Sequence, residues 1–125
     1  MLHMFLVALG GAVGSVCRYL VGQWSLRLFG PAFPWGTLVV NVAGSFAIGL
    51  LVELIARRLN ASTEMRLLII TGFLGGFTTF SAFSLDVISL VERSATLVGI
   101  TYIVVSVAVS LAAVFAGLAL GRSMF

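Results

Sequence analysis

The sequence is poor in charge. Only 9% of its 125 residues are Asp, Glu, Lys or Arg, whereas a soluble domain carries about 25%. With 61% apolar residues and a mean hydropathy of +1.22, the chain cannot be an ordinary water-soluble globule. A helix needs about 20 apolar residues to cross the hydrocarbon core of a bilayer. The sequence contains four long uncharged runs, residues 1–17, 28–52, 67–85 and 94–121, which together predict four membrane-spanning helices.

We therefore expect an all-α integral membrane protein with a single four-helix transmembrane domain over residues 1–125. The first apolar run is not preceded by the positive segment of a secretory signal, so we expect it to remain as a span. The connection over residues 22–34 contains the helix breakers Gly30 and Pro31. The predicted spans cover about residues 2–20, 35–56, 66–91 and 97–120.

Groups that carry enzymatic chemistry are scarce. Cys17 and His3 are the only cysteine and histidine, so neither an internal disulfide nor a thiolate metal cage can form. No Ser/His/Asp, Cys/His or phosphate-loop spacing is present, and we expect a protein that is not an enzyme. The four acidic residues all lie near span ends or in connections: Glu53, Glu64, Asp86 and Glu92. A proton-coupled cation exporter ordinarily needs a carboxylate at the bilayer midplane.

The basic residues are all arginines, and they are almost evenly divided between the two sides of the membrane. An even number of spans places both termini and the second connection on one side. That side holds Arg57, Arg58, Arg66 and Arg122, and the other holds Arg18, Arg27 and Arg93. Because arginine imbalance orients a membrane protein, this distribution favours insertion in both orientations. The alternative is that one arginine of difference, with Arg18 partly inside its span, selects a single orientation.

Polar side chains form two stripes with i+4 spacing, one on the second span and one on the fourth. The stripes are Thr37, Asn41 and Ser45, and Tyr102, Ser106 and Ser110. Small polar residues commonly form hydrogen bonds between membrane helices, and this structural role is one interpretation. Two stripes that include an Asn and a Tyr favour a water-accessible path instead.

The third span contains Gly75 and Gly76, followed closely by Thr78 and Thr79. Each glycine costs about 1 kcal/mol of helix propensity relative to alanine, so we expect the helix to break near its middle. A break at membrane depth leaves carbonyl oxygens that can bind a cation, and residues 75–79 are the candidate site. The alternative is tight packing by small residues, which we also expect for the glycine pairs with i+4 spacing elsewhere in the chain.

Phe80 and Phe83 are three residues apart on one face, directly after the predicted break. The edge of an aromatic ring carries partial positive charge and can face an anion, although core packing is the commoner role of such rings. Arg18, at the end of the first span, could attract anions to a vestibule. It could equally pair with Asp86 or extend its side chain to the interface.

Three segments resemble the signature blocks of the Fluc (CrcB) fluoride channels: GAVGSVCRY at 11–19, GTLVVNVAGSF at 36–46 and GFLGGFTTFSAFS at 72–84. The similarity covers the whole chain in length, number of spans and order of blocks. It implies an antiparallel homodimer in the bacterial inner membrane, with two pores that export fluoride passively from the cytoplasm. It also implies a structural Na⁺ at the dimer centre.

The resemblance also implies roles for individual residues. Phe80 and Phe83 match the aromatic box, with Ser81 between them, and Asn41 matches the pore-lining amide. Tyr102, Ser106 and Ser110 match a polar track along the pore. Gly75 and Thr78 match the Na⁺ ligands, which bind through backbone oxygens, and Arg18 matches the vestibule arginine.

The sequence departs from the family pattern at two positions. Ala82 stands where a threonine is usual, which removes one hydroxyl, and Asp86 stands where a glutamate is common. Two other functions remain as alternatives. A small multidrug exporter also has four spans and dual topology, but it would need a carboxylate in the first span. A scaffold whose polar stripes only join helices would conduct no ions.

Overall fold

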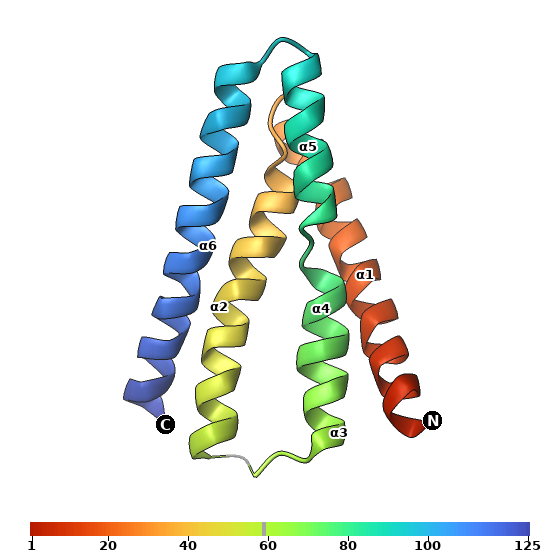
Figure 1. Ribbon diagram of the computed structural model, residues 1–125, viewed down its shortest axis with the longest axis vertical. Helices are drawn as coiled ribbons and strands as arrows, with labels where there is room; N and C mark the ends of the chain where they lie inside the picture. Colours follow the sequence, from red (N-terminus) through yellow and green to blue (C-terminus); the bar gives the residue numbers. More distant parts are fainter. Residues whose placement is uncertain (59) are drawn as a thin grey trace.

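The computed structural model describes residues 1–58 and 60–125, and helices make up nearly all of them. In chain order they are α1 (Leu2–Phe29), α2 (Trp35–Arg57), α3 (Thr63–Arg66), the π-helical segment η1 (Leu67–Leu74), α4 (Gly75–Phe77), α5 (Ser81–Glu92) and α6 (Thr96–Met124). The segments α3, η1, α4 and α5 follow one another in a single column (Figure 1). Four segments are long and apolar enough to cross a membrane: Leu2–Phe29, Trp35–Arg57, Thr63–Glu92 and Thr96–Met124. The prediction of an all-helical protein with four spans is confirmed.

The helices extend beyond the predicted spans, most clearly at α1, which continues past residue 20 to Phe29. A lone glycine such as Gly22 costs only about 1 kcal/mol in a helix, which is too little to end one. The helix stops at the first pair of strong breakers, Gly30 and Pro31, where Gly30 has a φ of 76°. At the start of α3, the Oγ of Ser62 accepts a hydrogen bond from the Met65 N–H (3.2 Å), as expected for a helix cap.

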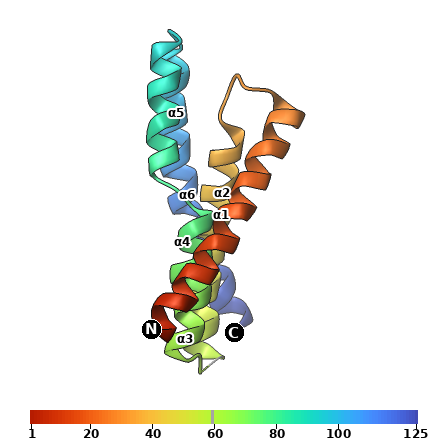
Figure 2. The same ribbon diagram turned by 90° about the vertical axis from the view of Figure 1, so that its right-hand side faces the viewer.

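Both termini and the connection between α2 and α3 lie at one end of the molecule, and the connections between α1 and α2 and between α5 and α6 lie at the opposite end (Figures 1 and 2). This arrangement divides the arginines in the way that the sequence predicts. In Figure 2 the helices α1 and α2 diverge from α5 and α6 toward the end away from the termini.

Small residues bring the helices into close contact. A Cβ atom on Gly10 or Gly14 of α1 would overlap backbone atoms of η1. A Cβ on Gly49 of α2 would overlap the Val114 carbonyl of α6, and Gly117 of α6 lies equally close to the α2 backbone. The packing role predicted for Gly10, Gly14 and Gly117 is confirmed, and Gly49 has the same role without having been predicted to.

Few large apolar side chains are buried: Leu38, Val40, Leu74, Phe83, Leu90 and Tyr102. Many more face outward along all four spans, including Phe5, Trp24 and Phe115. Such a surface would be costly in water but suits a protein whose outer helix faces contact lipid tails.

Candidate functional site

Two cavities lie on either side of the chain that joins α4 to α5. The outer cavity, about 520 Å³, lies where α1 and α2 diverge from α5, and its charged lining residues are Arg18, Asp86 and Arg93. The inner cavity is about 350 Å³ and is bordered by α2, α5, α6 and the chain between α4 and α5. Thr79 lines both cavities and therefore stands between them.

The inner cavity brings together most of the residues that the sequence analysis singled out. Asn41 comes from α2, Phe83 from α5, and Phe80 from the chain that precedes α5, while α6 contributes Ser106 and Ser110. The remaining lining residues are Ser45, Thr78, Thr79, Val107 and Leu111. Residues from separate spans thus converge on one cavity, as the two polar stripes lead one to expect.

The hydroxyls of Ser106 and Ser110 are buried, and neither has a hydrogen-bond partner among the described residues. Ser106 is only 6% exposed. A buried polar group without a partner costs about 1 to 3 kcal/mol, so such a group in a native protein indicates a bound water or ligand. Both hydroxyls line the inner cavity, which is where that ligand would lie.

The two phenylalanines of the cavity have different surroundings. Their ring centroids lie 5.5 Å apart, with an angle of 48° between the ring planes. Phe83 is 9% exposed and packs against Tyr102 at a centroid distance of 5.1 Å, whereas Phe80 is 77% exposed. The Phe83 ring is therefore fixed within the chain, and the Phe80 ring lies at the open rim of the cavity.

The chain between α4 and α5 uses side chains in place of helical hydrogen bonds. Thr78 has extended backbone, with φ of −87° and ψ of 158°. In a continuous helix the Thr79 N–H would donate to the Gly75 carbonyl, and the Ala82 N–H to the Thr78 carbonyl. Here the Thr79 N–H donates to the Asn41 Oδ1 (2.7 Å), and the Ala82 N–H donates to the Thr79 Oγ1 (3.1 Å).

As a result, the carbonyls of Gly75 and Thr78 accept no hydrogen bond within residues 1–58 and 60–125. Neighbouring carbonyls do have partners. The Gly76 carbonyl accepts from the Arg18 Nε (3.1 Å), and the Thr79 carbonyl accepts from the Asn41 Nδ2 (2.9 Å). The Gly75 and Thr78 oxygens are therefore among the groups available for a ligand at the interruption.

Tyr102 and Ser81 lie outside both cavities. Tyr102 is fully buried, and its hydroxyl donates to the Oδ2 of Asp86 (3.0 Å). Ser81 is exposed, with its Oγ 3.3 Å from the Thr79 Oγ1. Their expected places beside an ion path remain predictions.

Arg18 lines the outer cavity and holds the α4 backbone through its Nε. Among the described residues it forms no ion pair with Asp86, which is one of the pairings that the sequence left open.

Sequence reasoning missed the central position of Thr79. The adjacent threonines pointed to a weak helix, but nothing in their spacing indicated that Asn41 would hold the Thr79 backbone through both an N–H and a carbonyl. Ser45 was assigned to a stripe but not to the site. Its i+4 spacing from Asn41 on α2 is the signal that could have placed it beside the cavity.

Comparison with known proteins agrees with the sequence blocks. Residues 5–118 match the family model described as CrcB-like protein, Camphor Resistance (CrcB). A protein of Agrobacterium fabrum is 69% identical over 125 residues, the full length of both chains, and one of Rhizobium etli is 68% identical over 124 residues, 99% of each. A protein of a Chelativorans species is 57% identical over 124 residues, again 99% of each chain. All three relatives are named fluoride-specific ion channel FluC, and this chain belongs to the CrcB family.

Proposed function

We propose that the chain forms a fluoride-selective ion channel that lets fluoride leave the cytoplasm passively and so lowers its toxicity. The observation that carries the proposal is the inner cavity, where the two unpartnered hydroxyls, Ser106 and Ser110, lie with the Phe80 and Phe83 rings. Three relatives at 57% to 69% identity bear the name of a fluoride-specific ion channel.

The chemistry of this cavity suits an anion that sheds its water. Hydroxyl and amide groups donate hydrogen bonds to an anion, and ring edges present partial positive charge to it. No carboxylate lines the inner cavity in the part of the chain that the structure describes. A four-span multidrug exporter would need such a group to bind a cation and a proton, so the lining favours an anion pathway.

The outer cavity can collect anions for this pathway. Its two arginines, Arg18 and Arg93, outnumber its one carboxylate, Asp86, which leaves a net positive charge in a recess. A recess lined by charge of one sign raises the local concentration of ions of the opposite sign. Since Thr79 lines both cavities, an ion would pass that residue between them.

The proposal includes an antiparallel homodimer in the bacterial inner membrane. The nearly even division of arginines supports insertion in both orientations. The 77% exposure of Phe80 supports it as well, because a ring at the rim of an ion path needs a neighbour to cover its outer side. A second copy in the opposite orientation would provide that cover.

We also propose that Na⁺ binds at the interruption of the third span, through the backbone oxygens of Gly75 and Thr78 at the dimer centre. The support is that these two carbonyls lose their helical partners to the Asn41 and Thr79 side chains. Carbonyls of an unwound helix are ligands for Na⁺ in membrane proteins, so these residues fit the ion. When bound, the ion would balance the two carbonyl dipoles and fix the interruption.

The test is ion efflux from liposomes that hold the purified protein, read with fluoride and chloride electrodes. We expect fast fluoride release with negligible chloride, and we expect Phe80→Ile to block it while the dimer stays intact in size-exclusion chromatography. Phe115→Ile is the matched control, because that ring is 69% exposed on α6 and lines neither cavity. Absence of fluoride release from a folded dimer in Na⁺ buffer would contradict the channel.

The sodium proposal has its own readout. Replacing Na⁺ by the bulky organic cation N-methyl-D-glucamine should abolish conduction if the ion holds the interruption in place. Conduction that continues unchanged after this replacement would refute the Na⁺ site and leave the fluoride pathway standing.

A further inference from the structure

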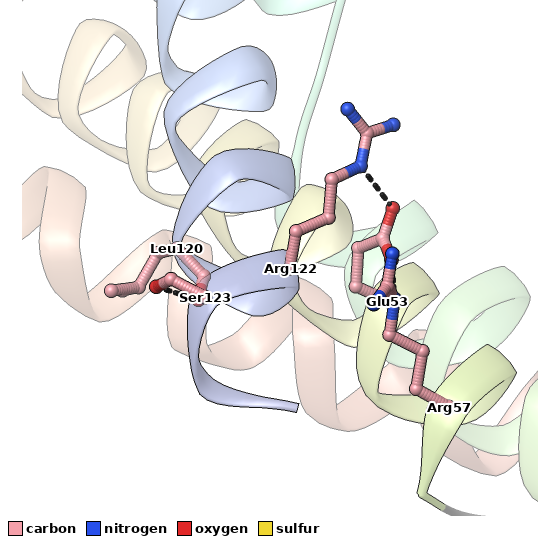
Figure 3. Close-up of polar contacts among 5 residues, drawn as sticks. All are labelled: Glu53, Arg57, Leu120, Arg122 and Ser123. Atoms are coloured by element: carbon pink, nitrogen blue, oxygen red, sulfur yellow. Dashed lines mark hydrogen bonds and ion pairs between the residues drawn. The ribbon is translucent and has the colours of Figure 1, made fainter.

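A second cluster of charge lies where α2 and α6 end, at the end of the molecule that carries both termini (Figure 1), and it lines neither cavity; Figure 3 shows it close up. There Glu53 of α2 accepts hydrogen bonds from two arginines. The Arg57 Nε lies 2.8 Å from one carboxylate oxygen, and the Arg122 Nε of α6 lies 2.9 Å from the other. We name Glu53, Arg57 and Arg122 the terminal cluster.

The carboxylate of the terminal cluster is enclosed, but its arginines are not. The Glu53 side chain is 10% exposed, whereas the side chains of Arg57 and Arg122 are 46% and 60% exposed. Gly121 makes this possible, because a Cβ there would lie 2.6 Å from the Glu53 Cβ. The fold therefore holds one buried anion beneath two exposed cations.

This arrangement leaves positive charge and hydrogen-bond donors unused. Two guanidinium groups on one carboxylate carry a net charge of +1, and each contacts Glu53 through Nε alone. Within residues 1–58 and 60–125 the terminal nitrogens of both arginines form no hydrogen bond. Figure 3 shows that those of Arg122 point away from Glu53. A guanidinium can bind a planar or tetrahedral oxyanion through two parallel N–H groups, so these nitrogens suit a second oxyanion.

The position of the cluster points to the source of that oxyanion. Arg57 and Arg122 lie in the last turns of α2 and α6, where the spans end and phospholipid phosphates lie. At the same ends of α2 and α6, Val52 and Leu120 are 47% and 40% exposed, on other faces of their helices than the cluster, and they suit contact with lipid acyl chains. A net charge of +1 matches the single negative charge of phosphatidylglycerol, whereas the choline group of a zwitterionic lipid would add a cation beside two others.

We propose that the terminal cluster binds the phosphate of an anionic phospholipid headgroup. Glu53 acts as the positioning residue, since it fixes both guanidiniums through Nε and leaves their outer nitrogens to the phosphate. The site stands apart from the ion pathway, so this proposal does not depend on whether the chain conducts fluoride.

The test measures lipid retention in detergent by native mass spectrometry, with phosphatidylglycerol and phosphatidylcholine offered in equal amounts. We expect the wild-type protein to retain phosphatidylglycerol about tenfold more than phosphatidylcholine, the effect of one good charge-assisted contact. The double variant Arg57→Lys with Arg122→Lys keeps two cations against Glu53 but loses the guanidinium fork. In that variant retention of phosphatidylglycerol should fall about tenfold.

Arg27→Lys is the matched control, because Arg27 is an exposed arginine in the last turn of α1, at the opposite end of the molecule. Its phosphatidylglycerol retention should equal that of the wild type. Inorganic phosphate added in excess separates a lipid site from a site for free phosphate, and the lipid should remain bound.

Equal retention of the two lipids by the wild-type protein would overturn the proposal, and this measurement stands even if the double variant fails to fold. Undiminished retention in a folded double variant, an equal loss in the Arg27 control, or displacement of the lipid by inorganic phosphate would also overturn it.

Discussion

Asn41→Ala is the substitution that tests the interruption of the third span most directly. The Asn41 amide accepts from the Thr79 N–H at 2.7 Å and donates to the Thr79 carbonyl at 2.9 Å. The variant removes both bonds. It also removes the competitor for the Thr79 N–H, which can then donate to the Gly75 carbonyl as in a continuous helix.

Two effects of different kind should follow. Each hydrogen bond contributes about 0.5 to 1.5 kcal/mol net, so losing both lowers the free energy of unfolding by about 1 to 3 kcal/mol. The re-formed helical bond offsets part of this loss. That same bond occupies the Gly75 carbonyl, and a cation that stabilises the folded protein through this oxygen should no longer do so.

The assay is denaturant unfolding of the protein in detergent micelles, performed once in Na⁺ and once in N-methyl-D-glucamine. The wild-type protein should be more stable in Na⁺, and Asn41→Ala should be less stable overall with little difference between the two cations. Ser45→Ala is the control, because Ser45 lies one turn along α2 and lines the same cavity without a hydrogen bond to the interruption. It should keep the cation-dependent difference.

The reasoning is refuted if Asn41→Ala unfolds at the same denaturant concentration as the wild type and keeps the full stabilisation by Na⁺. That result would mean that the amide does not determine which carbonyls are available. A loss of stability with an unchanged Na⁺ effect would refute only the assignment of the Gly75 oxygen.

Four further substitutions test the packing and one hydrogen bond. Gly49→Ala should lower the free energy of unfolding by about 1 to 3 kcal/mol, because its Cβ would overlap the Val114 carbonyl. Gly22→Ala, with nothing within 4 Å of the new atom, should raise that free energy by up to about 1 kcal/mol. Both are measured by denaturant unfolding, and equal effects would be inconsistent with this account. Tyr102→Phe and Asp86→Asn should be coupled by about 1 kcal/mol in a double-mutant cycle of unfolding, whereas additive effects would argue against their 3.0 Å hydrogen bond.

The number of spans was predictable because charge is costly in lipid. The chain restricts its charged residues to a few short segments, and the uncharged runs between them identify the four spans. The helix ends were less predictable. An uncharged run reports the thickness of the hydrocarbon core, whereas α1 continues through Arg27 until Gly30 and Pro31 end it.

The polar stripes were predictable as faces of single helices, but their partners were not. The i+4 spacing placed Asn41 on one polar helix face and Ser106 and Ser110 on another, and all three line the inner cavity. The same spacing assigned Tyr102 to that stripe, although its hydroxyl bonds to Asp86, which belongs to a neighbouring helix. Periodicity describes one helix at a time, so it could not reveal a partner on another.

The interruption of the third span likewise depends on a residue from another helix, which periodicity does not reveal. Glycines and threonines predict a weak helix, but which carbonyls it exposes depends on Asn41, which reaches the interruption from α2. Because Asn41 both lines the cavity and holds the Thr79 backbone, a loss of flux in an Asn41 variant cannot by itself assign it to the pore. Thr79→Val acts on the Thr78 carbonyl instead. It removes the hydroxyl that accepts from the Ala82 N–H, so that N–H can donate to the Thr78 oxygen as in a continuous helix. If Thr79→Val loses stabilisation by Na⁺ while the Asn41 amide is intact, the Thr78 oxygen is assigned to the cation site, and unchanged stabilisation would refute that assignment.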